Sequence, residues 1–171
     1  MNHLIIGGAR SGKSRYAQQL AARAGLDVIY IATATADDDE MRARIQQHQQ
    51  QRPAHWQLVE EPVQLANVLL LQAASDRVLL VDCLTLWLSN LLAQRDSTLL
   101  KSECDKLVNI IPDLPCQLIL VSNEVGQGIV PANALARRFI DEAGWLHQRL
   151  AEVCSTVTIM TAGLPQTLKP L

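Results

Sequence analysis

The chain has 171 residues, 49% apolar and 19% charged, with a formal net charge of −2, which excludes a disordered chain and a broadly basic surface for nucleic acid. The length suits one domain, 1–171, with a substantial core. No apolar run approaches the ~20 residues needed to cross a bilayer, so we expect no membrane span. The four scattered cysteines include no Cys-x-x-Cys pair, so we expect no zinc site and a reduced, cytoplasmic setting.

Short apolar runs alternate along the chain with segments in which apolar residues recur at helical spacing. The predicted strands lie at 4–6, 28–32, 56–59, 78–81, 118–121 and 157–160. The predicted helices lie between them, at 13–24, 37–50, 62–70, 84–94, 99–110 and 133–153. This alternation predicts an α/β fold with a mostly parallel sheet and helices on both faces.

A glycine-rich segment links the first predicted strand to the first predicted helix. It consists of Gly7, Gly8, Ala9, Arg10, Ser11, Gly12, Lys13 and Ser14. This spacing is that of a P-loop, in which backbone N–H groups cradle phosphates, the lysine reaches the β and γ phosphates and the serine binds Mg²⁺. A chance glycine turn is the alternative, but the position before a helix favours phosphate binding. We therefore predict a single P-loop NTPase-like domain with Lys13 as a catalytic residue and Ser14 as a metal ligand.

A carboxylate, Asp82, follows the inner apolar run 78–81. P-loop proteins commonly hold Mg²⁺ through a second carboxylate at the end of such a strand, so Asp82 is predicted to bind metal in the nucleotide site. Asp82 could instead cap the helix that begins near Leu84, and the two roles are compatible. The chain has no Asn-Lys-x-Asp motif that would indicate a guanine-specific switch protein.

The chain has four histidines, at positions 3, 48, 55 and 147, and none has metal-ligand spacing to another. A neutral imidazole can be a nucleophile or a base near neutral pH. A lone histidine is nevertheless more often a surface or core residue, and the residues alone leave the role of His48 open.

Six blocks, in order, resemble the bifunctional adenosylcobinamide kinase/adenosylcobinamide-phosphate guanylyltransferase family of cobalamin biosynthesis. They are Gly7 to Ala17, Tyr30 to Ala34, Asp39 to His48, Arg52 to Pro62, Asp82 to Leu92 and Asn123 to Ala151. The most distinctive stretch reads Asn-Glu-Val-Gly-x-Gly-Ile-Val-Pro at 123–131. The chain departs from the family pattern at Leu58, where threonine is usual, and at His147, where asparagine is usual.

The resemblance implies two successive reactions. In the first, a nucleoside triphosphate gives its γ-phosphoryl group to adenosylcobinamide. In the second, GMP from GTP is joined to adenosylcobinamide phosphate through a covalent guanylyl intermediate on His48, giving adenosylcobinamide-GDP and pyrophosphate. The implied ligands are GTP, ATP, Mg²⁺ and the two corrinoid substrates, and the implied assembly is a homo-oligomer, for which the resemblance suggests a trimer.

By position, the resemblance also implies nucleotide contacts outside the P-loop. These are Ala32, Thr33, Ala34, Gln49, Gln50, Gln51, Arg52 and Glu60. On general grounds Arg52 could equally be an exposed arginine at a helix end, and Glu60 a solvated carboxylate. Asn123 and Glu124 follow another buried strand, where open α/β sheets place ligands, and we assign them to substrate or metal.

Two other functions fit the P-loop. One is a monofunctional P-loop kinase of another small molecule, in which His48 is structural, and the other is a nucleotide-dependent regulatory binding protein with little catalysis. A further apolar group fits the core, a subunit contact or a bed for the corrinoid ring, with the core as the default. It consists of Trp87, Leu88, Leu91 and Leu92.

Overall fold

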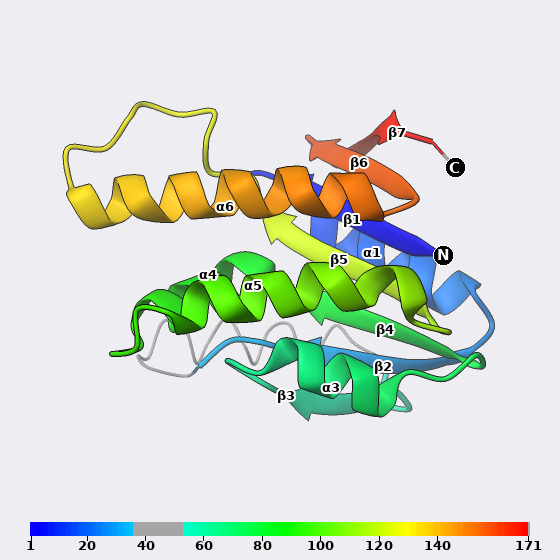
Figure 1. The fold of residues 1–171 in the computed structure, drawn as a ribbon. Coiled ribbons are helices and arrows are strands. Elements are labelled where there is room, and N and C mark those ends of the chain that lie inside the picture. The colour runs from blue at the N-terminus through cyan, green and yellow to red at the C-terminus, as the bar shows by residue number, and fades with distance from the viewer. Residues whose placement is uncertain (36–52, 171) are drawn as a thin grey trace.

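The computed structural model describes residues 1–35 and 53–170, which form a seven-stranded sheet in the order β3-β2-β4-β5-β1-β6-β7 (Figure 1). The strands are β1 (Asn2–Gly7), β2 (Asp27–Ala32), β3 (Gln57–Glu60), β4 (Arg77–Asp82), β5 (Gln117–Asn123), β6 (Thr156–Thr161) and β7 (Leu164–Lys169). Neighbouring strands are parallel except for β6 and β7, which are antiparallel. The predicted mostly parallel sheet is therefore confirmed.

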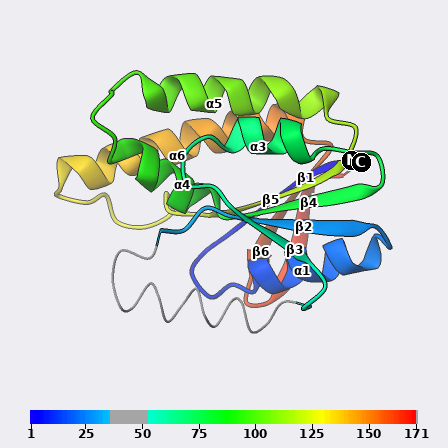
Figure 2. The same cartoon turned by 90° about the horizontal axis from the view of Figure 1, so that it is seen from below.

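Helices cover both faces of the sheet, as predicted. They are α1 (Lys13–Arg23), α3 (Leu65–Gln72), α4 (Leu84–Leu92), α5 (Leu99–Ile110), a 3₁₀ turn (Ile111–Asp113) and α6 (Ala134–Val153). Helix α1 lies on one face, and α3, α4, α5 and α6 lie on the other (Figure 2). The predicted helix at 37–50 lies outside the described residues. Within the described part of the chain, no helix combines the length and apolar character of a membrane span.

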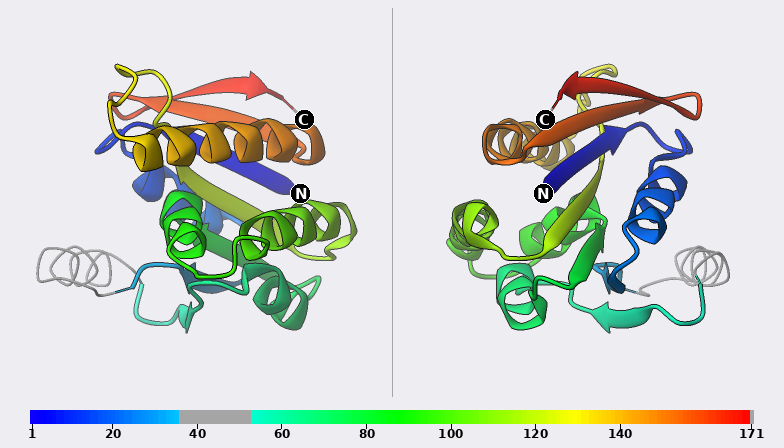
Figure 3. Two further views of the ribbon diagram at one scale, coloured as in Figure 1. Left: turned by 60° about the vertical axis from the view of Figure 1, so that its left-hand side comes forward. Right: turned by 90° about the vertical axis from the view of Figure 1, so that its right-hand side faces the viewer.

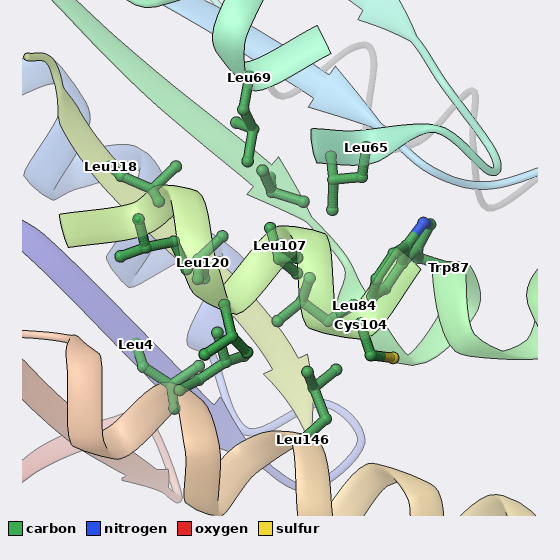
Figure 4. Close-up of a cluster of buried hydrophobic side chains, with 14 of the residues drawn as sticks. Leu4, Leu65, Leu69, Leu84, Trp87, Cys104, Leu107, Leu118, Leu120 and Leu146 are labelled. Carbon is green, nitrogen blue, oxygen red and sulfur yellow. The ribbon is translucent and has the colours of Figure 1, made fainter. Parts of the chain in front are cut away.

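The core has two parts because parallel strands point alternate side chains to opposite faces. Leu79 and Val81 of β4 belong to the cluster beneath α3 to α6, which Figure 4 shows, whereas Leu80 packs on the other face with Ala17 of α1. Burying one leucine contributes roughly 1.5–3 kcal/mol. The side chain of Trp87 is completely buried in the larger cluster, so the core interpretation of the apolar group on α4 is confirmed.

The carboxyl ends of four parallel strands meet at one edge of the sheet. Ala32 of β2 lies opposite Asp82 of β4, and Asp82 lies opposite Val121 of β5. On the other side of β5, Asn123 lies opposite Gly7, the last residue of β1. The P-loop strand and the Asp82 strand are thus separated by one strand, and their ends face the same side.

The structure differs from the predicted elements at two places. A seventh strand, β7, follows β6 through a two-residue turn in which Ala162 and Gly163 have positive φ values of 51° and 82°. This conformation is typical of a tight hairpin turn. Helix α3 begins at Leu65 instead of Pro62, because the Glu61 carboxylate accepts hydrogen bonds from the N–H groups of Val63 and Gln64.

Burial of His3 makes stability depend on pH. The His3 ring is buried, its Nε2 lies 2.8 Å from Thr158 Oγ1, and desolvation lowers its pKa. The unfolded chain therefore binds this proton at higher pH than the folded chain, and the free energy of unfolding falls as the pH drops below about 6.5. We expect His3→Gln to weaken this dependence in urea denaturation between about pH 7.5 and about pH 5. Burial also lowers the pKa of His147, so some dependence remains; a variant that keeps the full wild-type slope would contradict the prediction.

Candidate active site

The predicted P-loop folds as the link between β1 and α1. Gly12 has φ of 91°, a conformation that glycine adopts far more readily than other residues, and the N–H of Tyr16 then bonds its carbonyl at 2.9 Å to start the helix. No side chain caps the N-terminus of α1. The first N–H groups of the helix are therefore available to an anion, which fits a phosphate ligand.

The Lys13 side chain returns over this loop. Its Nζ donates to Gly8 O at 3.1 Å, and the residue is only 8% exposed. Burial lowers the pKa of the Lys13 ammonium, and the nearby Asp82 carboxylate opposes that shift. The structure thus brings together the lysine and the carboxylate that the sequence placed about seventy residues apart, as an NTPase phosphate site requires.

The turn between β6 and β7 contacts the phosphate loop and bonds to its backbone. Gly163 N donates to Ser11 O at 2.9 Å, and a Cβ on Gly12 would lie 3.3 Å from Gly163 Cα. Figure 3 shows the β6–β7 hairpin at the edge of the sheet beside β1, with α1 and α6 on opposite faces. The loop is therefore held by a segment that sequence patterns did not predict.

Gly7 is the most tightly packed glycine of this loop. A Cβ there would lie 2.6 Å from Ser11 Oγ and 2.7 Å from Met160 O, whereas a Cβ on Gly8 would meet nothing within 4 Å. We expect Gly7→Ala to lower the free energy of unfolding by ~1–3 kcal/mol, and Gly8→Ala to change it by less than ~0.5 kcal/mol. Denaturant unfolding of the pair measures this difference, and equal stability of the two variants would refute it.

Asp82 ends β4, and Tyr30 Oη of β2 donates to its Oδ2 at 3.0 Å. The alternative role as a helix cap is not observed, because Cys83 is the N-cap residue of α4 and no side-chain cap bond is present. No group of three or more His, Cys, Asp or Glu side chains suited to a metal occurs within 1–35 and 53–170. Mg²⁺ usually takes one or two protein ligands together with substrate phosphates, so Ser14 and Asp82 fit it without such a group.

The ends of β2 and β3 hold other predicted nucleotide contacts. Ala32 lies between Glu60 on β3 and Asp82 on β4 in the strand register, and Glu60 is exposed. Thr33 is fully buried: its hydroxyl donates to Cys83 O at 2.7 Å and accepts from Cys83 N at 3.0 Å. The Thr33 hydroxyl therefore joins β2 to β4, and the nucleotide contacts of Ala32, Thr33, Ala34 and Glu60 stay predictions.

The remaining predicted site residues lie outside the described part of the chain. They are His48, Gln49, Gln50, Gln51 and Arg52. The covalent role of His48 and the nucleotide contacts of its neighbours therefore stay predictions.

Asn123 and Glu124 lie where the sequence placed them, at the end of β5. Asn123 Nδ2 donates to Thr85 Oγ1 at 2.7 Å, and Glu124 N donates to Gly7 O at 2.9 Å. The Glu124 carboxylate accepts from the N–H groups of Gly126 and Gln127, so it shapes its own loop. Their assignment to substrate or metal stays a prediction.

A contact between a histidine and a serine, which the sequence did not single out, lies near the end of β5. The Nε2 of His147 on α6 lies 2.7 Å from Ser122 Oγ. Burial lowers the pKa of His147, and the Glu124 carboxylate opposes this shift. The only signal in the sequence was the departure from the family pattern at His147.

Comparison with known proteins identifies the family. The family model described as "Cobinamide kinase / cobinamide phosphate guanyltransferase" (CobU) matches residues 3–168. The chain belongs to this family. The expected resemblance is confirmed.

Relatives within this family match the chain nearly end to end. "Bifunctional adenosylcobalamin biosynthesis protein CobP" of Pseudomonas aeruginosa is 56% identical over 169 residues, which cover 99% of this chain and 98% of the relative. "Bifunctional adenosylcobalamin biosynthesis protein CobU" of Salmonella typhimurium is 40% identical over 179 residues, covering 97% of this chain and 98% of the relative.

Solved structures resemble the fold of this family member. A Pyrococcus horikoshii OT3 protein has a TM-score of 0.56 at 10% identity, covering 99% of this chain and 86% of that protein. The RadB recombinase has a TM-score of 0.52 at 13% identity, covering 92% of this chain and 73% of the recombinase. At such low identity the likeness concerns the fold alone, and it agrees with the predicted P-loop NTPase-like class.

Proposed function

We propose that this chain is a bifunctional enzyme of cobalamin biosynthesis, which phosphorylates adenosylcobinamide and then guanylylates adenosylcobinamide phosphate. The proposal rests above all on the phosphate loop, where Lys13 and Asp82 come together in a chain 56% identical to a protein named as bifunctional in adenosylcobalamin biosynthesis. A monofunctional kinase or a regulatory nucleotide-binding protein would share the loop but not this family membership.

In the first reaction, the substrate hydroxyl oxygen attacks the γ phosphorus of ATP or GTP. The bond to the β–γ bridging oxygen breaks, the nucleoside diphosphate leaves and the hydroxyl proton passes to solvent water. The Lys13 ammonium and the N-terminal N–H groups of α1 hold the phosphates and offset the charge on the leaving oxygen. Ser14 and Asp82 would hold Mg²⁺, which supplies further charge neutralisation at the β and γ phosphates.

In the second reaction, a nitrogen of His48 attacks the α phosphorus of GTP, and pyrophosphate leaves. A phosphate oxygen of adenosylcobinamide phosphate then attacks the same phosphorus, which forms adenosylcobinamide-GDP and releases His48. In this proposal the residues at the ends of β2 and β3 and those just after His48 hold the nucleotide. They are Ala32, Thr33, Ala34, Gln49, Gln50, Gln51, Arg52 and Glu60.

The proposal also includes one domain over 1–171, a cytoplasmic location and a homo-oligomer, a trimer as the family resemblance implies. The number of subunits would follow from sedimentation of the purified protein.

The decisive experiment supplies purified protein with adenosylcobinamide, ATP and GTP labelled at the α phosphate. We expect adenosylcobinamide phosphate, then adenosylcobinamide-GDP, and a protein-bound label that acid releases and alkali spares, as a histidine phosphoramidate should behave. Phosphorylation without guanylyl transfer would support the monofunctional kinase, and nucleotide binding without either product would support the regulatory protein.

A further inference from the structure

The Asn90 side chain connects two strand exits, by which we mean the short segments that directly follow β2 and β3. Asn90 lies on α4, and its Nδ2 donates to Thr33 O at 2.7 Å and to Pro62 O at 3.1 Å. Thr33 directly follows β2, and Pro62 comes two residues after the end of β3. A single amide nitrogen therefore uses both of its hydrogens to hold the chain where it leaves two neighbouring strands.

The surroundings of Asn90 fix this connection in place. One turn earlier on α4, the buried Trp87 donates its Nε1 hydrogen to Val63 O at 2.7 Å, next to the Pro62 contact. Glu61 N donates to Ala32 O at 2.9 Å, which continues the pairing of β3 with β2 beyond the strand end. Helix α4 therefore contacts the segments that follow both strands, and the Asn90 amide bonds to each of them.

These exits are separate from the phosphate loop. The loop lies between β1 and α1 and is supported by the turn at Gly163, whereas the bonds of the Asn90 side chain go to Thr33 and Pro62. Ala32 and Ala34, which flank Thr33, and Glu60, two residues before Pro62, are among the residues that hold the nucleotide for guanylyl transfer in the proposed function.

We propose that Asn90 is a positioning residue for guanylyl transfer, because its amide anchors the segments that follow β2 and β3 to helix α4. This inference rests on the proposed function. Without the amide hydrogens, the Thr33 and Pro62 carbonyls lose their common donor, and the segments after β2 and β3 keep their mutual Glu61–Ala32 bond but lose this anchor on α4. Phosphoryl transfer depends on Lys13, Ser14 and Asp82, none of which bonds to the Asn90 amide. The amide reaches Asp82 only through Thr33 and Cys83, and Asp82 is also held by its place in β4 and by the Tyr30 hydroxyl.

The test compares two activities in one preparation of the full-length protein. Asn90→Asp keeps the side-chain shape but replaces the donor with an acceptor that repels both carbonyls. Asn67→Asp is the matched control, since Asn67 is exposed on α3 and its amide donates to the Gln64 side chain. Phosphorylation is measured with adenosylcobinamide, and guanylyl transfer is measured separately with supplied adenosylcobinamide phosphate and GTP, with kcat and KM for each nucleotide.

We expect Asn90→Asp to reduce kcat/KM for guanylyl transfer by ~10- to 100-fold and to change phosphorylation by less than about threefold, because small displacements of reacting groups have such effects. Misfolding lowers both activities together, so the ratio of the two reports positioning. Equal losses of both activities, or no loss of either, would overturn the inference. A wild-type enzyme that phosphorylates adenosylcobinamide but transfers no guanylyl group would instead refute the proposed function.

Discussion

Lys13→Ala is expected to reduce phosphorylation of adenosylcobinamide by roughly 100- to 1000-fold in kcat/KM, the effect of removing one preorganised charge donor. Lys13 is buried in the loop with its Nζ 3.1 Å from Gly8 O, and Asp82 is the nearby negative charge. Without the ammonium, the Asp82 carboxylate faces the phosphates with less compensating charge. Guanylyl transfer should fall as well, because the same loop holds the phosphates of GTP in the proposed function.

The stability of this variant gives a second, independent result. Burial disfavours the charged form of Lys13, so alanine removes a desolvated ammonium from the folded state. Because alanine also removes the Nζ bond to Gly8 O and the charge that faces Asp82, we expect these effects to offset each other and the melting temperature to change little while activity falls steeply. Arg23→Ala, at the exposed far end of α1, is the matched control and should keep both activities. Full phosphorylation by Lys13→Ala would show that the loop is not the phosphoryl-transfer site.

His48→Ala is expected to abolish the acid-labile label from GTP and to reduce guanylyl transfer at least ~1000-fold, as loss of a covalent nucleophile does in other enzymes. Phosphorylation of adenosylcobinamide should stay within about threefold of wild type, because it draws on the loop between β1 and α1. The two measurements are made on the same protein with α-labelled GTP and with adenosylcobinamide plus ATP.

His55→Ala controls for the loss of an imidazole in this part of the sequence, since His55 is exposed. It should label and turn over like the wild type. Persistent labelling of His48→Ala would place the nucleophile at another residue, and parallel loss of phosphorylation would show that His48 is needed for the nucleotide site as a whole.

Sequence patterns predicted the inner part of the fold better than its edge. Strands β4 and β5 are covered on both faces, so their apolar runs are continuous and easy to recognise. Strand β7 contains Pro165 and is mostly exposed, as suits an edge strand, and it therefore has no apolar pattern. The one usable signal was Gly163, whose positive φ permits the tight turn after β6.

In the candidate site, likewise, the sequence predicted the local structure but not the contacts between distant residues. The phosphate loop is a local structure, so the spacing of its glycines and Lys13 was sufficient to predict it. The contact of Tyr30 with Asp82, the bridge from Thr33 to Cys83 and the two bonds of Asn90 depend on strand order. Such contacts join residues far apart in the chain, and no pattern in a single sequence specifies which strands become neighbours.

The position of β1 in the sheet has a consequence for the newly made chain. Strand β1 is synthesised first, yet its two neighbours are β5 (Gln117–Asn123) and β6 (Thr156–Thr161), and the bond that steadies Ser11 comes from Gly163. A ribosome that has reached residue 110 has thus released the whole phosphate loop without any partner for its strand. A polypeptide that ends before Thr156 therefore lacks one neighbour of β1 and the Gly163 bond to Ser11, two supports that the phosphate loop has in the folded chain.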